Sequence, residues 1–378
     1  MEYISLNKIC DVRDGTHDSP QYVLSGYPLV TSKNIVDGKL DLSTVNYLSQ
    51  EDYDKINVRS KVDNGDIIMP MIGTIGNPFL VNEDPNYAIK NVALIKFPNK
   101  DINNRFIWYF LKSGAFKKYV SEKNKGGTQK FLSLSDIRNM SVPLYSLDNQ
   151  LEIVKKLDLI SQIIDKRRLE LNDLDRLIKA RFVEMFGSIK EERLLGDISE
   201  FVTVGIANSA THAYAEAGIP MLRNQNIKEN YLDDTDLIYI TPEFAAKYET
   251  KKLKENDIIA MRTGYPGIAC LVPKKYEGCQ TFTTLIVRLK AENNPSYVCS
   301  YINSDLGKSF IEAGKVGVAQ QNFGTKSLAK MPIKIAPKEL QDDYALFVKQ
   351  VDKSKSAVQK ALGETQLLFD SLMQKYFG

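Results

Sequence analysis

The stretch "NGDIIMPMIGTIGNPFLV" (residues 64–81) returns in altered form as "ENDIIAMRTGYPGIACLV" (residues 255–272). Both versions run through Asp-Ile-Ile, two glycines three residues apart, and a closing Leu-Val. Aliphatic runs on either side of a glycine pair predict two strands joined by a tight turn. The first version ends its turn on Asn77-Pro78-Phe79, and the second carries Ile268-Ala269-Cys270 there. A shared frame with a variable tip favours a recognition loop over a reaction centre, although divergence of one copy alone would leave the same pattern.

The duplication extends over the whole chain. The shift of 191 residues that carries Asp66 onto Asp257 also carries Gln129 onto Gln320, and it matches the Phe-Gly pairs at 186–187 and 377–378. Upstream, "GYPLVTSKNI" (26–35) matches "GIPMLRNQNI" (218–227) at a shift of 192, so a single-residue insertion or deletion separates the two blocks. The protein is therefore two tandem copies of about half its length, and repeats of this size are whole domains.

The composition is that of an ordinary globular protein with room for two or three domains. The net charge is only +3, from 50 basic and 47 acidic residues, so a nucleic-acid partner would require basic residues grouped in patches. The sequence offers no membrane-spanning run and no signal peptide, which predicts a cytoplasmic chain without a membrane partner. The cysteines lack metal-ligand spacing and are expected to be buried thiols; they are Cys10, Cys270, Cys279 and Cys299.

Each copy divides into two unlike parts. The first part alternates short β-branched runs such as "VALIKF" with Gly, Pro and Asn, which is typical of a mixed α and β domain. It includes one expected helix, "NRFIWYFLKSGAFKKYV" (104–120), whose apolar stripe we interpret as core packing. The second part is a long helix. We predict domains at 1–146 and 190–337, and long helices at 147–189 and 338–378.

Both long helices carry an apolar residue at alternating spacings of three and four, which is the seam of a coiled coil. Neither helix can bury such a stripe alone, so we predict that they pair. An antiparallel pair would leave one domain near each end and relate the copies by an approximate two-fold axis; a parallel homodimeric coil is the alternative. Lys355 and Thr365 are expected to weaken the second seam. The predicted fold class is α+β. The apolar seam residues are Ile153, Leu157, Ile160, Ile164, Leu171, Leu174 and Ile178 in the first helix, and Val348, Val351, Val358, Leu362, Phe369 and Leu372 in the second.

Basic residues lie beside amides and glycines at matching places in the two copies. Arg pairs with guanine and Asn or Gln with adenine in the major groove, while Lys and backbone N–H groups hold phosphates. Each cluster alone would also suit a solvated loop, but recurrence in both copies strengthens the nucleic-acid interpretation. The candidates are Thr16, His17, Lys33, Asn34, Met71, Gly73, Thr74, Gly76, Lys125, Gln129 and Lys130 in the first copy, and His212, Arg223, Asn224, Gln225, Asn226, Arg262, Thr263, Gly264, Tyr265, Gln320, Gln321 and Asn322 in the second.

Two features refine that set. Met71 stands where the second copy has Arg262, so the two hairpin tips are expected to make different base contacts. The histidines fall early in their copies, at the ends of "DGTH" and "SATH". They have no neighbouring ligands at metal-site spacing, and each is interpreted as a loop-ordering residue or a single phosphate contact.

Motifs for chemistry are missing from the sequence. "GTKS" (324–327) lacks the glycine that precedes the lysine of a phosphate-binding loop, and no glycine-rich nucleotide fingerprint or nucleophile elbow is present. The segment Asn77-Pro78-Phe79 lacks the second proline of the amino-methyltransferase tetrapeptide. We therefore predict no catalytic residue, no metal site and no cofactor in this chain.

The sequence resembles the specificity subunit of type I restriction–modification systems. The likeness rests on "DGTH" (14–17), the two glycine hairpins, "FLKSGAFKKY" (110–119), "VPLYSLDNQ" (142–150) and long helices that end in Phe-Gly. It covers the whole chain, and the duplicated layout is more specific than any single motif.

The resemblance implies two target recognition domains, each reading one half of an asymmetric bipartite site in double-stranded DNA, with the long helices as the spacer. Half-sites one helical turn apart are separated by ~34 Å. It further implies docking of two methyltransferase subunits and, in some assemblies, two restriction subunits. S-adenosylmethionine, ATP and Mg are expected only on these partners. The alternatives are a divergent stand-alone DNA adenine methyltransferase and a coiled-coil adaptor that never meets DNA.

Overall fold

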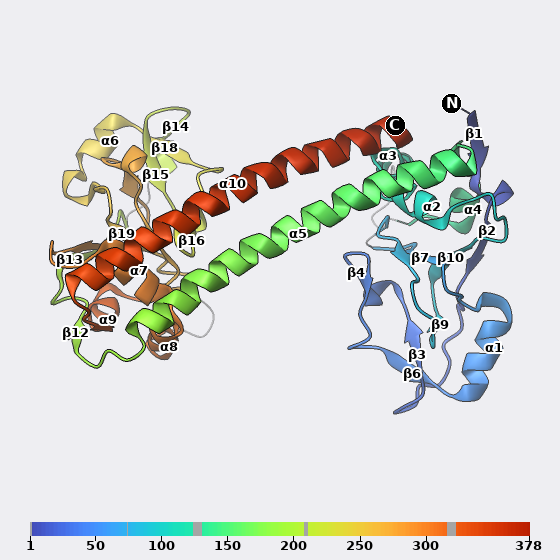
Figure 1. The fold of residues 1–378 in the computed structure, drawn as a ribbon, viewed down its shortest axis with the longest axis horizontal. Helices are drawn as coiled ribbons and strands as arrows, with labels where there is room; N and C mark the ends of the chain where they lie inside the picture. Colours follow the sequence, from blue (N-terminus) through green and yellow to red (C-terminus); the bar gives the residue numbers. More distant parts are fainter. Residues whose placement is uncertain (1, 74, 124–130, 208–210, 316–322) are drawn as a thin grey trace. The chain divides into compact units, whose positions relative to one another are not determined.

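The computed structural model contains two compact units (Figure 1). Unit 1 comprises Met1–Arg168 and Lys360–Gly378, and unit 2 comprises Leu169–Gln359. Each unit therefore holds one mixed domain together with a stretch of both long helices. The structure describes residues 2–73, 75–123, 131–207, 211–315 and 323–378.

A four-stranded antiparallel sheet forms the centre of the first domain, with strand order β2-β10-β7-β8. Side chains alternate between its faces, because successive residues of a strand point to opposite sides. Ile67 and Met69 join one apolar cluster, and Ile68 joins the other. Both faces are thus covered, which explains why β7 is apolar throughout. The strands are β2 (Asp11–Asp14), β7 (Ile67–Pro70), β8 (Phe79–Leu80) and β10 (Val92–Lys96).

The second domain repeats this sheet in the order β13-β22-β19-β20. Ile67 pairs with Leu80 in the first domain, and Ile258 pairs with Leu271 in the second. The predicted strand, glycine turn and strand are therefore confirmed in both copies. The strands of the second sheet are β13 (Ser199–Val204), β19 (Ile258–Ala260), β20 (Ala269–Leu271) and β22 (Leu285–Leu289).

Smaller sheets complete each domain. In the first, β3 lies between β6 and β9, β4 pairs with β5, and β1 pairs with β11. In the second, the orders are β14-β18-β15-β21, β16-β17 and β12-β23. The bounds are β1 (Glu2–Ser5), β3 (Tyr27–Val30), β4 (Ile35–Val36), β5 (Lys39–Leu40), β6 (Asn46–Leu48), β9 (Ala88–Ile89), β11 (Ser141–Leu144), β12 (Glu192–Leu194), β14 (Tyr214–Ala215), β15 (Ile219–Leu222), β16 (Ile227–Lys228), β17 (Tyr231–Leu232), β18 (Ile238–Ile240), β21 (Gln280–Thr281) and β23 (Pro332–Lys334).

The single helix predicted over 104–120 is wrong: two helices replace it. The chain leaves the first at Leu111 and re-enters helix at Gly114. In the second domain the break is at Ser304, whose side chain caps the next helix by accepting from the Gly307 N–H. The expected core role of this region is confirmed, since Phe106 and Tyr109 are both 1% exposed. The helices are α1 (Gln50–Ser60), α2 (Asn104–Phe110), α3 (Gly114–Lys123), α4 (Leu134–Arg138), α6 (Pro242–Ala246), α7 (Pro295–Asn303), α8 (Asp305–Ala313) and α9 (Thr325–Ala329).

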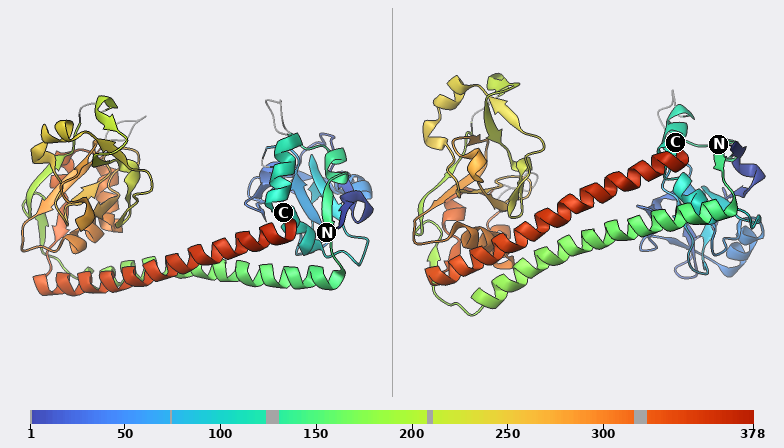
Figure 2. Two further views of the ribbon diagram at one scale, coloured as in Figure 1. Left: turned by 90° about the horizontal axis from the view of Figure 1, so that it is seen from above. Right: turned by 45° about the horizontal axis from the view of Figure 1, so that its top comes forward.

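The two long helices are α5 (Leu147–Phe186) and α10 (Lys338–Phe377). In unit 1, Arg167 of α5 donates to the Ala361 carbonyl oxygen and to the Thr365 hydroxyl. Nearer the start of α5, the Tyr145 hydroxyl donates to the Tyr376 carbonyl oxygen at 3.1 Å. Residue numbers rise along α5 as they fall along α10, so the helices are antiparallel. Figure 2 shows the end of α10 and the start of α5 beside the first domain.

Unit 2 repeats the antiparallel pairing. The ammonium of Lys355 lies 2.6 Å from the Asp175 carboxylate. Arg181, further along α5, places its guanidinium 5.7 Å from the ring centre of Phe347, which precedes Lys355. The predicted antiparallel helix pair is therefore confirmed within each unit.

Every residue of the predicted seam is buried or half-buried. The prediction that the two helices bury their stripes against each other is incomplete, because the domains cover part of each stripe. Ile153 and Leu157 join the core of the first domain, and Ile178 and Val348 join the core of the second. The same cores also bury three phenylalanines that the predicted seam did not include: Phe182, Phe186 and Phe377. The ends of the helices are thus parts of the domains.

Candidate nucleic-acid interface

The glycines of the two hairpins have matching backbone conformations. Gly73 and Gly264 have φ of 77° and 80°, and Gly76 and Gly267 have φ of 87° and 93°. L-residues rarely adopt this left-handed region, so glycine is favoured at all four positions. The second glycine of each pair has a further reason: a Cβ there would press on Phe116 or Ile311. The second glycine of each pair is therefore packed against the domain, whereas the first glycine has open space around it.

The side chains presented by the tips differ. In the first domain Met71 is buried and Ile72 is half-exposed, so its described part is apolar. In the second domain the equivalent of Met71 is the half-buried Arg262, and Tyr265 is 74% exposed. The candidates Thr74, Lys125, Gln129, Lys130, Gln320, Gln321 and Asn322 lie outside the described residues.

A short 3₁₀ turn lies after β3 and after β15. Asn34, in the turn Ser32–Asn34, accepts from the Thr31 N–H and donates to the Asp41 carbonyl oxygen at 3.2 Å. Asn226, in the turn Asn224–Asn226, does the same with Arg223 and Asp233. Both amides are at least 96% buried. We assign these two candidates to the architecture of the loop. Lys33, beside Asn34, is exposed.

In the second domain the 3₁₀ turn contacts the hairpin tip. The Asn224 amide donates to the Thr263 hydroxyl at 2.8 Å. Arg223 and Gln225 both donate to Asp236. Two loops distant in sequence therefore form one polar surface, which we call the tip surface. It consists of Arg223, Asn224, Gln225, Arg262, Thr263 and Tyr265.

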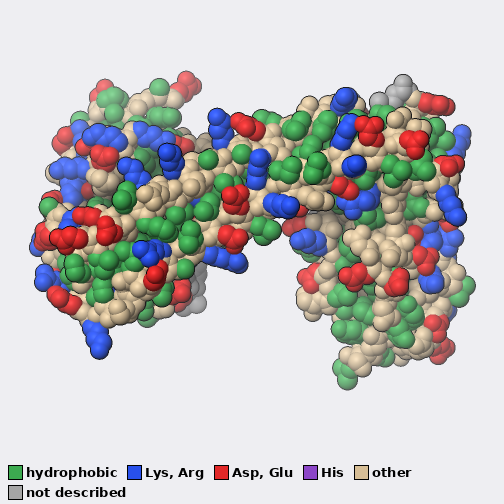
Figure 3. Space-filling view, in the orientation of Figure 1, with side chains coloured by type: hydrophobic (Ala, Val, Ile, Leu, Met, Phe, Trp, Pro, Cys, Tyr) green, Lys and Arg blue, Asp and Glu red, His purple; other side chains and the backbone are tan. Residues whose placement is uncertain are grey.

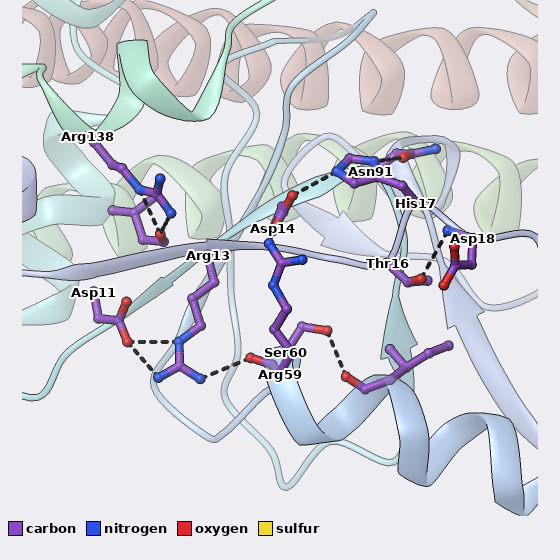
Figure 4. Close-up of polar contacts among 12 residues, drawn as sticks. Asp11, Arg13, Asp14, Thr16, His17, Asp18, Arg59, Ser60, Asn91 and Arg138 are labelled. Atoms are coloured by element: carbon purple, nitrogen blue, oxygen red, sulfur yellow. Dashed lines mark hydrogen bonds and ion pairs between the residues drawn. The ribbon is translucent and has the colours of Figure 1, made fainter.

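In the first domain, the "DGTH" segment closes a polar network (Figure 4). His17 Nε2 lies 2.7 Å from Asp14 Oδ2, and its Nδ1 lies 2.8 Å from Asn91 Oδ1. Arg59, at the end of α1, pairs with the other oxygen of Asp14. Because both ring nitrogens face oxygen acceptors, the doubly protonated ring satisfies both contacts at once. The hydrogen bonds to Asn91 and then Asp14 raise the pKa of His17.

The two histidines do not occupy equivalent places, although the sequence sets both early in their copies. The N–H of Thr16 donates to Ile89 O at 2.9 Å, and the N–H of Ile206 donates to the matching Thr281 O at 2.8 Å. The residue after Ile206 is Ala207, which therefore takes the place of His17. His212 instead packs edge-on against Phe244, with ring centres 5.3 Å apart.

The network of Asp14, Arg59 and Asn91 was missed by sequence reasoning. Arg59 lies 45 residues from Asp14 and Asn91 lies 74 from His17, so no local pattern connects them. Asp236 was missed for the same reason. The structure shows a left-handed backbone at Asn91, with φ of 54°, and at the equivalent Thr283 of the second domain.

Charge of both signs is spread over the domains. Figure 3 shows Lys and Arg interspersed with Asp and Glu on the visible face. Within the residues that the structure describes, no three His, Cys, Asp or Glu side chains come together as a metal site. All four cysteines are buried and free, as predicted. None of the helices in the described part of the chain combines the length and apolar character of a membrane span.

A comparison with known protein families identifies the family that has this architecture. The model for the "Type I restriction modification DNA specificity domain" matches residues 1–173 and again residues 189–365. The chain belongs to this family. The type I specificity family thus accounts for the duplication, and the resemblance deduced from the sequence is confirmed.

Several specificity subunits are similar to this chain. The EcoBI specificity subunit of Escherichia coli is 32% identical over 152 residues, which cover 40% of this chain and 32% of that subunit. The MjaVIII specificity subunit of Methanocaldococcus jannaschii is 26% identical over 186 residues, 47% of this chain and 43% of its own length. The chain thus matches less than half the length of either. The EcoKI specificity subunit of E. coli K12 is 19% identical over 93% of this chain and 81% of its own.

Solved structures share the fold. The S subunit of a type I restriction–modification system from M. genitalium aligns with a TM-score of 0.58 at 13% identity, covering all of this chain and 96% of that one. A chain from a study of complex assembly and conformational transition of the type I system aligns with a TM-score of 0.62 at 16% identity, over 100% and 97%. At such identities the likeness establishes the fold of the type I specificity family and nothing finer.

Proposed function

We propose that this protein is the sequence-reading subunit of a type I restriction–modification complex. In this proposal each domain reads one half of an asymmetric bipartite site in double-stranded DNA. The observation that carries it is the pair of hairpins with matching strand pairing and glycine conformations but different side chains at their tips. Because the two domains share their backbone framework, they are expected to dock on the duplex in the same way. Because the side chains at their tips differ, they are expected to read different bases.

The chemistry of the tips supports different half-sites. The tip surface of the second domain offers Arg262, Asn224 and an exposed tyrosine, which are donors suited to purine edges in the major groove. The first domain offers apolar Ile72 on its hairpin and an exposed Lys33 on its 3₁₀ turn. Apolar contact suits a thymine methyl group, and a lysine suits the phosphate next to it.

The outer face of α5 supports docking of methyltransferase subunits. Five of its apolar side chains are 46–66% exposed. At ~100° of rotation per residue they fall in one stripe on the face opposite the seam. An exposed apolar stripe on a helix is a surface for a partner helix. Figure 3 shows hydrophobic side chains exposed along the long helices. The stripe consists of Leu151, Leu159, Leu169, Leu177 and Val183.

The remaining parts of the proposal follow from the family. Two methyltransferase subunits would bind S-adenosylmethionine and extrude the target base, while this chain holds the flanking duplex. Restriction subunits would supply ATP- and Mg-dependent steps. The domains would be related by an approximate two-fold axis with the helices as spacer, and the assembly would work in the cytoplasm. We assign no catalytic step to this chain.

Methyl transfer separates the proposal from the enzyme alternative. The purified chain is incubated with duplex DNA and labelled S-adenosylmethionine, with and without its methyltransferase partner. We expect label in DNA only when both proteins are present. Label transferred by this chain alone would establish the stand-alone methyltransferase instead.

The adaptor alternative predicts no affinity for DNA at all. Binding of the chain to a duplex is measured between 50 and 200 mM salt. Several phosphate contacts would make the affinity fall steeply as counterions compete, by a factor of about 10³ or more for six contacts. Absence of binding at the lowest salt would favour the adaptor.

A further inference from the structure

Two residues of the tip surface share one carboxylate. Arg223 Nη2 donates to the Asp236 carbonyl oxygen at 3.0 Å and to its Oδ2 at 3.1 Å. Gln225 Nε2 donates to the same Oδ2. The Arg223 side chain is 25% exposed, whereas that of Asp236 is 73% exposed. An exposed acid therefore holds one half-covered donor, Arg223, and one exposed donor, Gln225.

The acid is itself fixed by the backbone. The buried amide of Asn226 donates to the carbonyl oxygens of Asp233 and Asp236 at 2.9 and 3.1 Å. This amide also accepts from the Arg223 N–H at 2.9 Å. One side chain thus ties the start of the 3₁₀ turn to the segment that carries Asp236. This frame fixes the backbone of Asp236 relative to Arg223, so the carboxylate is presented from a fixed point beside the guanidinium.

We propose that Asp236 is a positioning residue that sets the base preference of the second domain by orienting Arg223 and Gln225. This inference rests on the proposed function. An unrestrained arginine can reach many acceptors, and ordering it on binding costs entropy. Held at Nη2, it directs Nη1, which makes no hydrogen bond among the described residues, toward one place. An acceptor on a base edge, such as guanine N7 or O6, fits that donor.

The pairing of an arginine with an aspartate at these positions is found in the second domain and not at the equivalent positions of the first. At the shift of 192 residues that aligns these segments, Thr31 stands for Arg223 and Thr44 stands for Asp236. Part of the frame is nevertheless shared, because Asn34 holds Asp41 as Asn226 holds Asp233. The first half-site therefore provides an internal reference in any experiment on Asp236.

The competing explanation is that Asp236 acts only as a negative charge that repels DNA. Removing a repulsive charge would strengthen binding to every sequence equally. Removing a positioning group would instead reduce the difference between right and wrong bases. Asp234 provides the matched control, since it is a half-buried acid two residues away that pairs with Lys275 and Tyr276.

The test measures binding of the full-length chain to its selected duplex and to duplexes with one base pair changed in either half-site. With Asp236→Ala we expect discrimination at one position of the second half-site to fall about tenfold, the effect of one lost base contact. Discrimination in the first half-site should not change. Asp236→Asn, which keeps one acceptor oxygen, should lose less. Asp234→Ala should raise affinity for all duplexes and keep discrimination.

Repeating the substitution in an Arg223→Ala variant tests whether Asp236 acts through Arg223. When Arg223 is already alanine, Asp236→Ala should cause no further loss at the position that Arg223 reads. Unchanged discrimination in Asp236→Ala, or an equal further loss in the Arg223→Ala background, would overturn the inference. If the wild-type chain fails to discriminate in both half-sites, the proposed function fails and this inference falls with it.

Discussion

The ring of Phe377, one residue from the end of the chain, lies 5.2 Å from the ring of Phe106, centre to centre. The equivalent pair in the second domain, Phe186 and Tyr297, lies 4.4 Å apart. Each domain core is therefore completed by the last turn of the other copy's long helix. The duplicated halves exchange their helix ends, and neither domain is closed by its own copy alone.

Truncation of the exchanged ring should destabilise the first unit. Phe377 is 1% exposed, and removing a buried phenylalanine side chain costs about 3–5 kcal/mol. We expect Phe377→Ala to speed hydrogen exchange in α2 and α3 and to leave α7 and α8 unchanged. Leu367→Ala on the same helix is the control, because that side chain is 71% exposed. Equal protection of α2 in both variants would contradict the exchange of helix ends.

The two glycines of a hairpin should respond differently to alanine. Gly264→Ala meets no atom within 4 Å and carries only the left-handed backbone penalty, about 1 kcal/mol. Gly267→Ala carries the same penalty and also presses on Ile311, and overpacking adds about 1–3 kcal/mol. Denaturant unfolding of the two variants measures the difference. A Gly264→Ala variant that is the less stable of the two would refute the packing argument.

The His17 network predicts that stability depends on pH. The pKa of His17 is raised above its ordinary value of 6.5, so folding favours the protonated ring. Its contribution is complete below pH 6.5 and is lost as the pH rises through the raised pKa. Local hydrogen exchange around "DGTH", compared between wild type and His17→Gln, should differ most below pH 6.5 and converge as the pH rises through the raised pKa of His17. His212→Gln, whose ring packs on Phe244, should not change this segment. A difference independent of pH would contradict the charged network.

The apolar stripe of α5 should be required for partner binding and not for DNA binding. Leu169→Ser removes an apolar side chain that is 62% exposed. We expect this variant to lose co-purification of the methyltransferase subunit while its affinity for duplex DNA is unchanged. Glu170→Ser changes an exposed neighbour at the same cost in helix propensity and should retain the partner. Retention by both variants would move the docking surface elsewhere.

Periodic features were predictable because they are local. The long helices with their apolar seam and the glycine hairpins follow from spacings that lie within a few turns or strands, whereas the antiparallel direction of the helices does not. The helix break near Gly114 was missed, since the apolar stripe runs through it. Lys355 and Thr365 looked like defects in the seam, yet each has a partner across it, Asp175 and Arg167. Such partners lie 180 and 198 residues away, beyond the reach of any local pattern.

The candidate contacts were the least predictable part. Asn34 and Asn226 lie in the same polar clusters as Lys33 and Arg223, but their side-chain amides already hydrogen-bond within the domain. A sequence does not distinguish an amide that holds a loop from one that reads a base. Burial and bonding separate them, and they leave Lys33 and the tip surface as the contacts to test.

Selection of binding sites from a randomised duplex pool tests most directly whether the two domains read different halves of one bipartite DNA site. The full-length chain, with its methyltransferase partner, should enrich two short blocks of fixed sequence separated by an unselected gap of constant length. Arg262→Ala should alter one block and leave the other block and the gap unchanged. Enrichment of a single block, or a change in both blocks from this one substitution, would contradict the account.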